Sequence, residues 1–167
     1  MSTTTDRAIS EDEKSEFESY AKSGLKLLGK IESADPGELV AAVDTYIAKH
    51  QKASTGFVKK LFSKAPDNIE TSLALGIVWG NQLVRAFRWE WVCVLVEGEE
   101  RYAVVAPDRS LVVFATYFVK ECLDHATADC TVLLSYNMLR ENRLSTEPTR
   151  GYTSVMQSVR RIVPQKR

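Results

Sequence analysis

The sequence predicts a single α+β domain, on three observations. Its 167 residues suit one domain, because domains usually contain about 100–200 residues. Apolar residues recur every three to four positions over most of the chain, as in amphipathic helices. Between residues 89 and 114 this spacing changes to two, as in strands. We therefore expect N-terminal helices, a three-stranded antiparallel β-meander and C-terminal helices, packed as one domain over residues 10–163.

The first nine residues are polar and aperiodic, and we expect residues 1–9 to be disordered. A first helix is predicted over about 11–32. Ser10 and Glu13 form a capping-box pattern at its start, in which each side chain accepts a hydrogen bond from the other residue's backbone N–H.

A second helix is predicted over about 35–50, because Asp35 supplies an acceptor at the N-cap and Pro36 suits the first helical position. A short basic helix over about 54–64 follows. The most apolar helix is expected over about 68–87, with the buried stripe Ile69, Leu73, Gly76, Ile77, Gly80, Val84 and Phe87. Its two glycines lie one turn apart, which indicates a helix that lies close to the sheet.

Three β-rich runs come next, at residues 89–96, 102–106 and 111–114. The connections between them are short, so neighbouring strands must pair antiparallel. These runs are apolar on both faces, whereas an antiparallel sheet with one face in water alternates apolar with polar residues. The second face must therefore be covered by helices, by another subunit or by a partner, and we expect helices of the same chain to cover it.

Helical spacing returns after the strands. We predict helices over 117–125 and 130–142, with Asp129 as the cap of the second, and a last helix over 152–163 that follows a loop at 145–151.

Composition excludes several classes of function. The 22 basic residues equal the 22 acidic ones, whereas nucleic-acid binding usually needs a basic excess. The start of the chain has no basic region followed by an apolar run, so it does not resemble a secretory signal. The apolar stretch Leu73–Val84 is too short to span a bilayer. Three cysteines without an export signal suit reduced thiols. We expect a cytoplasmic protein with no nucleic-acid or membrane partner; homo-oligomerisation stays open.

Cys122, His125 and Cys130 form the one group that suggests metal or thiol chemistry. Helical spacing places Cys122 and His125 on one side of a helix, and Cys130 is close enough in sequence to fold back towards them. A structural zinc site needs four ligands, so this set is incomplete. The other interpretation is a helix C-terminus with a favourable histidine and two semi-buried thiols. We expect no catalytic residue, no metal and no cofactor, and keep this group as the alternative.

Two sets of residues are candidates for binding. Tryptophan is enriched at binding sites, which singles out Trp79, Trp89 and Trp91, although tryptophans more often belong to a core. The acidic turn with Glu97, Glu99 and Glu100 has carboxylates for a cation, but it lacks the alternating oxygen ligands of a calcium loop. Its other interpretation is a solvated turn.

The middle of the chain resembles a known family. The residues that carry the resemblance are Leu75-Gly76, Trp79-Gly80-Asn81-Gln82, Trp89-Glu90-Trp91, Ala106-Pro107-Asp108 and Val112-Val113-Phe114, followed by the helix through Val119 and Leu123. In this order they resemble the bacterial domain-of-unknown-function family numbered 3806, over roughly residues 70–140. Ala115 stands where a proline is expected. The resemblance implies a bacterial origin and a fold, and no activity.

These observations leave three hypotheses. The leading one is a non-enzymatic protein-binding module, specifically a bacterial immunity protein that neutralises a partner toxin. The second is a small-molecule-binding domain, with a pocket between helix 68–87 and the sheet near Trp79 or Trp91. The third is an enzyme that uses the group of Cys122, His125 and Cys130.

Overall fold

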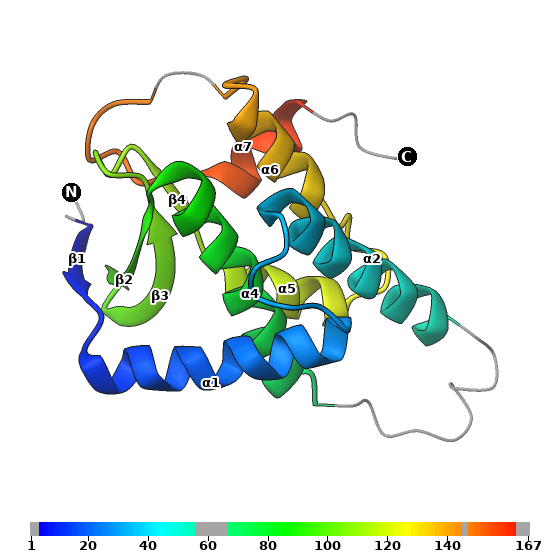
Figure 1. Ribbon diagram of the computed structural model, residues 1–167. Coiled ribbons are helices and arrows are strands. Elements are labelled where there is room, and N and C mark those ends of the chain that lie inside the picture. Colours follow the sequence, from blue (N-terminus) through cyan, green and yellow to red (C-terminus); the bar gives the residue numbers. More distant parts are fainter. Residues whose placement is uncertain (1–3, 56–66, 145–146, 163–167) are drawn as a thin grey trace.

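The computed structural model describes residues 4–55, 67–144 and 147–162 (Figure 1), which contain six helices and a five-stranded mixed sheet. The helices are α1 (Glu11–Leu28), α2 (Pro36–Ser54), α4 (Ile69–Phe87), α5 (Ala115–Asp124), α6 (Val132–Arg140) and α7 (Val155–Ile162). The strands are β1 (Thr5–Ala8), β2 (Glu90–Val96), β3 (Glu99–Val105), β4 (Leu111–Val113) and β5 (Thr153–Ser154). The α+β class is confirmed. Residues 56–64 of the expected short basic helix lie outside the described residues.

The sheet is larger than the predicted three-stranded meander. Strands β2, β3 and β4 form that meander, and each is antiparallel to the next. At one edge β1 pairs antiparallel with β2, and at the other edge β5 pairs parallel with β4. The prediction of three strands is therefore wrong, because β1 and β5 are too short to show a period of two in the sequence.

Strand β1 falls in the segment that was expected to be disordered. Charged side chains hold it in place from both faces of the sheet. The guanidinium of Arg7 donates two hydrogen bonds of 3.0 Å to the Glu13 carboxylate, and Asp6 accepts a 2.9 Å bond from Arg109. Disorder is thus wrong for residues 5–8, because pairing with β2 and ion pairs, one of them with the distant Arg109, order a segment whose local sequence carries no strand signal.

The N-terminal ends of the first two helices are as predicted. Ser10 and Glu13 make both hydrogen bonds of the capping box at α1, and the Asp35 carboxylate caps α2. Helix α1 ends at Leu28, four residues before the predicted end. Gly29 follows with a φ of 61°, a left-handed conformation that suits glycine and ends helices.

The predicted cap of α6 is wrong. Asp129 lies three residues before Val132, the first residue of the helix, so it is outside the N-cap position, which Thr131 occupies without a side-chain hydrogen bond. The backbone N–H of Leu133 instead donates to Asp44 on α2, at 3.0 Å. A carboxylate from another helix thus accepts the hydrogen bond that a local N-cap side chain would otherwise accept.

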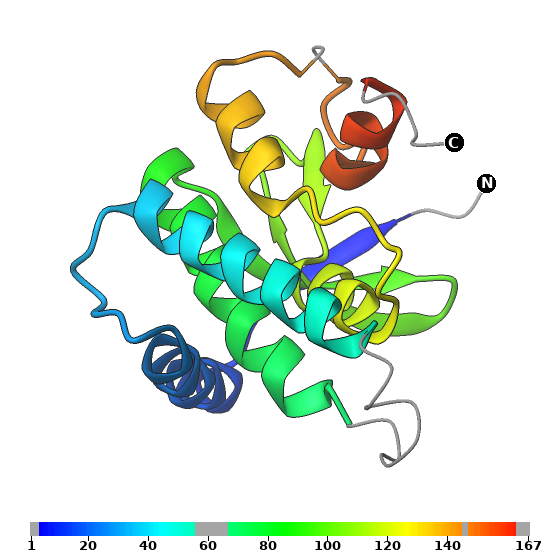
Figure 2. The ribbon, with the colours of Figure 1, turned by 90° about the vertical axis from the view of Figure 1, so that its right-hand side faces the viewer.

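Helix α4 lies in the middle of the helical part, packed against α1, α2 and α5 (Figures 1 and 2). Its two glycines permit close approach, as expected, but to different neighbours. A Cβ on Gly80 would lie 2.1 Å from the Trp91 ring of β2, whereas one on Gly76 would lie 2.5 Å from the Cα of Thr116 in α5. Gly80 therefore faces the sheet and Gly76 faces a helix.

Both faces of the sheet are buried. Val104 and Val113 belong to the main core with the helices, while the second face forms its own cluster of side chains that are at most 2% exposed: Val92, Val94, Ala103, Val105 and Val112. Phe114 and Tyr152 pack against this cluster. The chain itself therefore buries the second face, but the expectation that its helices do so is wrong, because Phe114 and Tyr152 both lie outside the helices.

Candidate functional site

A pocket of about 450 Å³ lies between α1, α4 and the sheet, a volume within the usual range for small-molecule sites. Helix α1 contributes Lys14, Phe17, Glu18, Ala21, Lys22 and Leu25, and α4 contributes Val78, Asn81, Gln82 and Arg85. Ile9, Glu32, Leu39 and Trp91 complete the lining. The residues on each helix recur at three- to four-residue spacing, so each helix presents one face to the pocket.

The crossing of α1 and α4 explains why a pocket forms here. At Gly24 the helices touch, since a Cβ there would lie 2.5 Å from the carbonyl oxygen of Ala74 and 2.7 Å from the Val78 side chain. From this crossing α4 rises away from α1 towards its C-terminal end (Figure 1). The two helices diverge over the residues that line the pocket, so the space between them is left open.

The apolar part of the lining is rigidly placed. Trp91 and Phe17 meet edge to face, with ring centroids 4.9 Å apart. The indole Nε1–H of Trp91 donates a 2.9 Å hydrogen bond to Asn81 Oδ1. Gly80 allows the indole to lie against α4. The Trp91 ring is therefore held on three sides, as a preformed binding surface requires.

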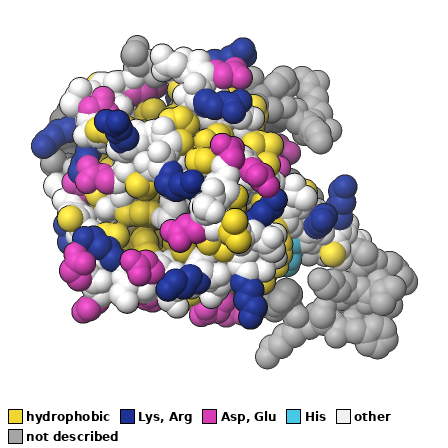
Figure 3. Space-filling view, in the orientation of Figure 1, with side chains coloured by type: hydrophobic (Ala, Val, Ile, Leu, Met, Phe, Trp, Pro, Cys, Tyr) yellow, Lys and Arg dark blue, Asp and Glu magenta, His cyan; other side chains and the backbone are white. Residues whose placement is uncertain are grey.

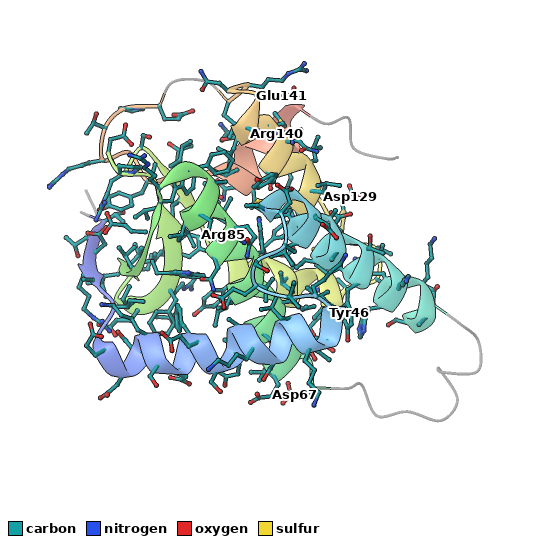
Figure 4. All side chains as sticks on the ribbon, viewed as in Figure 1. Tyr46, Asp67, Arg85, Asp129, Arg140 and Glu141 are labelled. Atoms are coloured by element: carbon teal, nitrogen blue, oxygen red, sulfur yellow. The ribbon has the colours of Figure 1, made fainter. Side chains whose placement is uncertain are left out.

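Arg85 forms a network of hydrogen bonds at the polar end of the pocket. Its Nη1 donates to the backbone oxygens of Glu32 and Ala34, at 3.0 and 3.2 Å, and to Gln82 Oε1 at 2.7 Å. Gln82 is buried, and its amide nitrogen donates to the carbonyl oxygen of Val78 at 2.8 Å. These bonds hold the loop between α1 and α2 on α4. Figure 4 labels Arg85 on this helix.

Charges of both signs surround the pocket. The face drawn in Figure 3 has apolar side chains between basic and acidic ones, with α1 along its lower edge. Lys14 forms an ion pair with Glu11. Lys22 and Arg85 have no carboxylate partner among the described residues, and no cation there pairs with Glu18 or Glu32. The pocket thus has unpaired charges that a ligand can use.

The three candidate tryptophans have different environments. Trp79 is fully buried and packs against Phe118, with ring centroids 5.9 Å apart. Trp89 is also buried and lies near Phe87. Trp91 alone of the three lines the described pocket. The second hypothesis placed a pocket near Trp79 or Trp91, and the structure has one at Trp91.

The acidic turn is shorter than predicted, because only Glu97 and Gly98 lie between β2 and β3, while Glu99 and Glu100 are the first residues of β3. Glu99 forms an ion pair with Arg101, and Glu100 forms one with Arg7. Glu97 and Gly98 both have positive φ, at 51° and 86°, as in the tight turn of a hairpin. Because arginines neutralise Glu99 and Glu100, the turn does not concentrate negative charge for a cation.

The group of Cys122, His125 and Cys130 is only partly assembled. Helix α5 ends at Asp124, and His125 has an extended backbone, so helical spacing no longer places its exposed ring beside Cys122. The Cys130 thiol lies 3.5 Å from Asp44 Oδ1. Contact with the Cys122 thiol, together with burial, raises the pKa of Cys130. The described residues contain no group of three His, Cys, Asp or Glu side chains suited to a metal ion.

Sequence reasoning missed the polar residues of the pocket. Asn81, Gln82 and Arg85 stand on one face of helix α4, after its apolar run at residues 73–80. The interruption of the apolar stretch by Asn81 and Gln82 was visible in the sequence, and it marks polar groups inside the domain. The role of Arg85 depends on the loop at 29–35, which no local pattern places against α4.

Comparison with family models, with curated proteins and with solved structures finds no match to this chain. The resemblance to the family numbered 3806 therefore stays a prediction. Within the part of the chain that the structure describes, no helix has both the length and the apolar character needed to cross a membrane.

Proposed function

We propose that the protein is a non-enzymatic binding module that takes a small organic ligand in the pocket between α1, α4 and Trp91. One observation carries this proposal: a half-buried indole, fixed by Asn81 and packed on Phe17, forms the wall of a pocket with unpaired polar groups. An apolar wall with few polar groups is typical of small-molecule sites.

Two of the three thiols are unsuited to nucleophilic catalysis, which supports the non-enzymatic part of the proposal. Burial raises the pKa of Cys93, and the Cys122 contact raises that of Cys130. Both thiols are then protonated near neutral pH, and the thiol form is a poor nucleophile.

Tryptophan fluorescence combined with thermal unfolding tests the proposal. A ligand at about a hundred times its Kd stabilises a protein by about 2.7 kcal/mol, which for this size corresponds to a rise in Tm of about 5–10 °C. Binding should also change the emission of Trp91. Trp91→Phe should remove the emission change, whereas Trp89→Phe, outside the pocket, should keep it. A broad metabolite panel that shifts neither Tm nor emission contradicts the proposal.

A protein partner, such as a bacterial toxin bound by an immunity protein, is a second proposal. The end of α1 favours it, because Leu27 and Ile31 are 48% and 69% exposed and Ile69 of α4 is 46% exposed. Grooves of about 640 and 410 Å³ meet at Leu27. Exposed apolar groups of this kind are typical of protein interfaces.

Substitution at Leu27 tests this second proposal. Leu27→Glu should abolish co-elution with a protein that copurifies from the native host, because it places a charge in an apolar contact. Ser15→Glu, an exposed position nearer the start of α1, should leave co-elution unchanged. A partner that elutes with both variants does not bind at this end of α1, and a chain that elutes alone before any substitution has no such partner.

A further inference from the structure

We propose that the pocket ligand carries a carboxylate on an aromatic or other apolar body, with the carboxylate held by Arg85 and the body packed against Trp91. This inference rests on the proposed function and specifies the class of ligand. Several hydrogen-bond donors at this pocket have no acceptor among the described residues, and they define the class.

Arg85 has a free pair of donors. A guanidinium has five N–H groups in a rigid plane. The Nη1 group bonds Glu32, Ala34 and Gln82, and Nη2 makes one further bond, of 3.2 Å, to the Ala34 oxygen. Nε and the second Nη2 hydrogen have no acceptor among the described residues. These two N–H groups lie along one edge of the guanidinium, and a carboxylate accepts from such an edge with two parallel hydrogen bonds.

The neutral polar side chains beside Arg85 also leave a donor. Asn81 Oδ1 is taken by the Trp91 indole, and both ends of the Gln82 amide are hydrogen bonded. The amide N–H₂ of Asn81 has no acceptor within the described part of the chain. It lines the same pocket as Arg85 and lies on the same face of α4, one turn earlier. The polar groups left without a partner at Asn81 and Arg85 are therefore all donors. An anionic ligand can accept hydrogen bonds from them, whereas an ammonium group, itself a donor, cannot.

The charged groups at the pocket do not all favour an anion. Lys22 adds a second positive charge, but the carboxylates of Glu18 and Glu32 also line the pocket. Arg85 and both glutamates are exposed, so water screens the attraction of the one and the repulsion of the others. The guanidinium offers directed hydrogen bonds in addition to its charge, and such bonds are the stronger interaction. Removing one glutamate charge should therefore tighten the binding of an anion.

Phe17, Trp91 and Val78 determine the rest of the ligand. The aromatic rings of Phe17 and Trp91 lie in the apolar part of the lining with several aliphatic side chains, and Arg85 lines the same pocket. A volume of about 450 Å³ holds a ring with a short acidic side chain.

Four small probes separate this inference from the proposed function. Calorimetric titration with phenylacetate, 3-phenylpropionate, phenylacetamide and phenethylamine compares an acid, a longer acid, a neutral amide and a cation on similar rings. We expect both acids to bind at least about tenfold more tightly than the amide, since hydrogen bonds to a charged group are the stronger ones. This comparison uses the unaltered chain.

Variants then assign the carboxylate to Arg85. Arg85→Lys keeps the charge and loses the paired donors, so it should weaken the binding of the acids about tenfold and that of the amide by much less. Arg140→Lys, at the exposed end of α6 (Figure 4), should change neither. Glu18→Gln should strengthen acid binding a few fold. Amide or amine binding that equals or exceeds acid binding overturns the inference and keeps the pocket as a binding site. Failure of all four probes overturns the inference for this ligand class, and the metabolite panel then decides the proposed function by itself.

Discussion

Replacing Gly76 by alanine should lower the free energy of unfolding by about 3 kcal/mol, the upper part of the range for overpacking a core. The added Cβ would lie 2.5 Å from the Cα and 2.8 Å from the backbone nitrogen of Thr116. These are main-chain atoms at the start of α5, so no side chain can rotate to make room. The gain in helix propensity, about 1 kcal/mol, offsets only part of this cost.

Thermal and denaturant unfolding measure the effect. A loss of about 3 kcal/mol corresponds to a fall in Tm of about 6–12 °C for a chain of this size. Gly37→Ala is the matched control, because its Cβ would meet only the Asp35 carboxylate at 3.1 Å and the Tyr136 ring at 3.6 Å. That variant should stay within about 1 kcal/mol of the parent. If Gly76→Ala is as stable as the parent, α4 and α5 are not packed as described.

Glu13→Ala should cost about 2–3 kcal/mol, because one carboxylate joins three parts of the fold. Glu13 accepts hydrogen bonds from the Ser10 backbone at 2.6 Å, from Arg7 in β1 twice at 3.0 Å, and from the Tyr102 hydroxyl in β3 at 2.7 Å. Without it, α1 loses its capping box and Tyr102 and Arg7 lose a partner. Glu16→Ala, an exposed position on the same helix, is the control and should change stability by less than about 0.5 kcal/mol.

The same carboxylate makes stability depend on pH. Hydrogen bonds from Arg7 hold the pKa of Glu13 far below its ordinary value of 4.5. Its contribution is therefore complete above pH 4.5 and is lost as the pH falls through the lower, folded-state pKa. The bond to Glu13 also raises the pKa of Tyr102 to about 12. Denaturant unfolding between pH 7 and pH 3 should show the gap between parent and Glu13→Ala narrowing at acid pH; a constant gap contradicts this role.

The sequence was a good guide where the determinants of structure are local. The capping box at Ser10 and the cap at Asp35 each join residues three positions apart, and both are present. The predicted buried stripe of α4 is only partly correct: Gly76, Ile77 and Gly80 are buried, whereas Ile69 is 46% exposed. Helix α4 packs against α1, α2 and α5, so its middle turns are buried all round and not along one stripe.

Prediction from the sequence failed where a residue far away in the chain determines the local structure. Strand β1 depends on Arg109, and the start of α6 depends on Asp44; neither partner is within reach of a periodicity argument.

The pocket was predictable only in its position. Trp91 was a candidate because tryptophan is enriched at binding sites, and helix 68–87 because its two glycines indicate close packing on the sheet. The polar lining was not predictable, because the partners of Arg85 are backbone oxygens of Glu32 and Ala34. Every residue has a backbone carbonyl oxygen, so the residue types at positions 32 and 34 do not indicate that these oxygens bind Arg85.

The pairing of β1 with β2 also bears on how the chain reaches its fold. Thr5 lies opposite Leu95, so the earliest described strand must wait for residues synthesised much later. At ~5–20 residues per second on the ribosome, this delay is about 5–20 s. During that time Arg7 has no strand to join, and α1 lacks the sheet beneath Phe17. We expect the N-terminal strand to dock late, after α4 and the β2–β3 hairpin have formed.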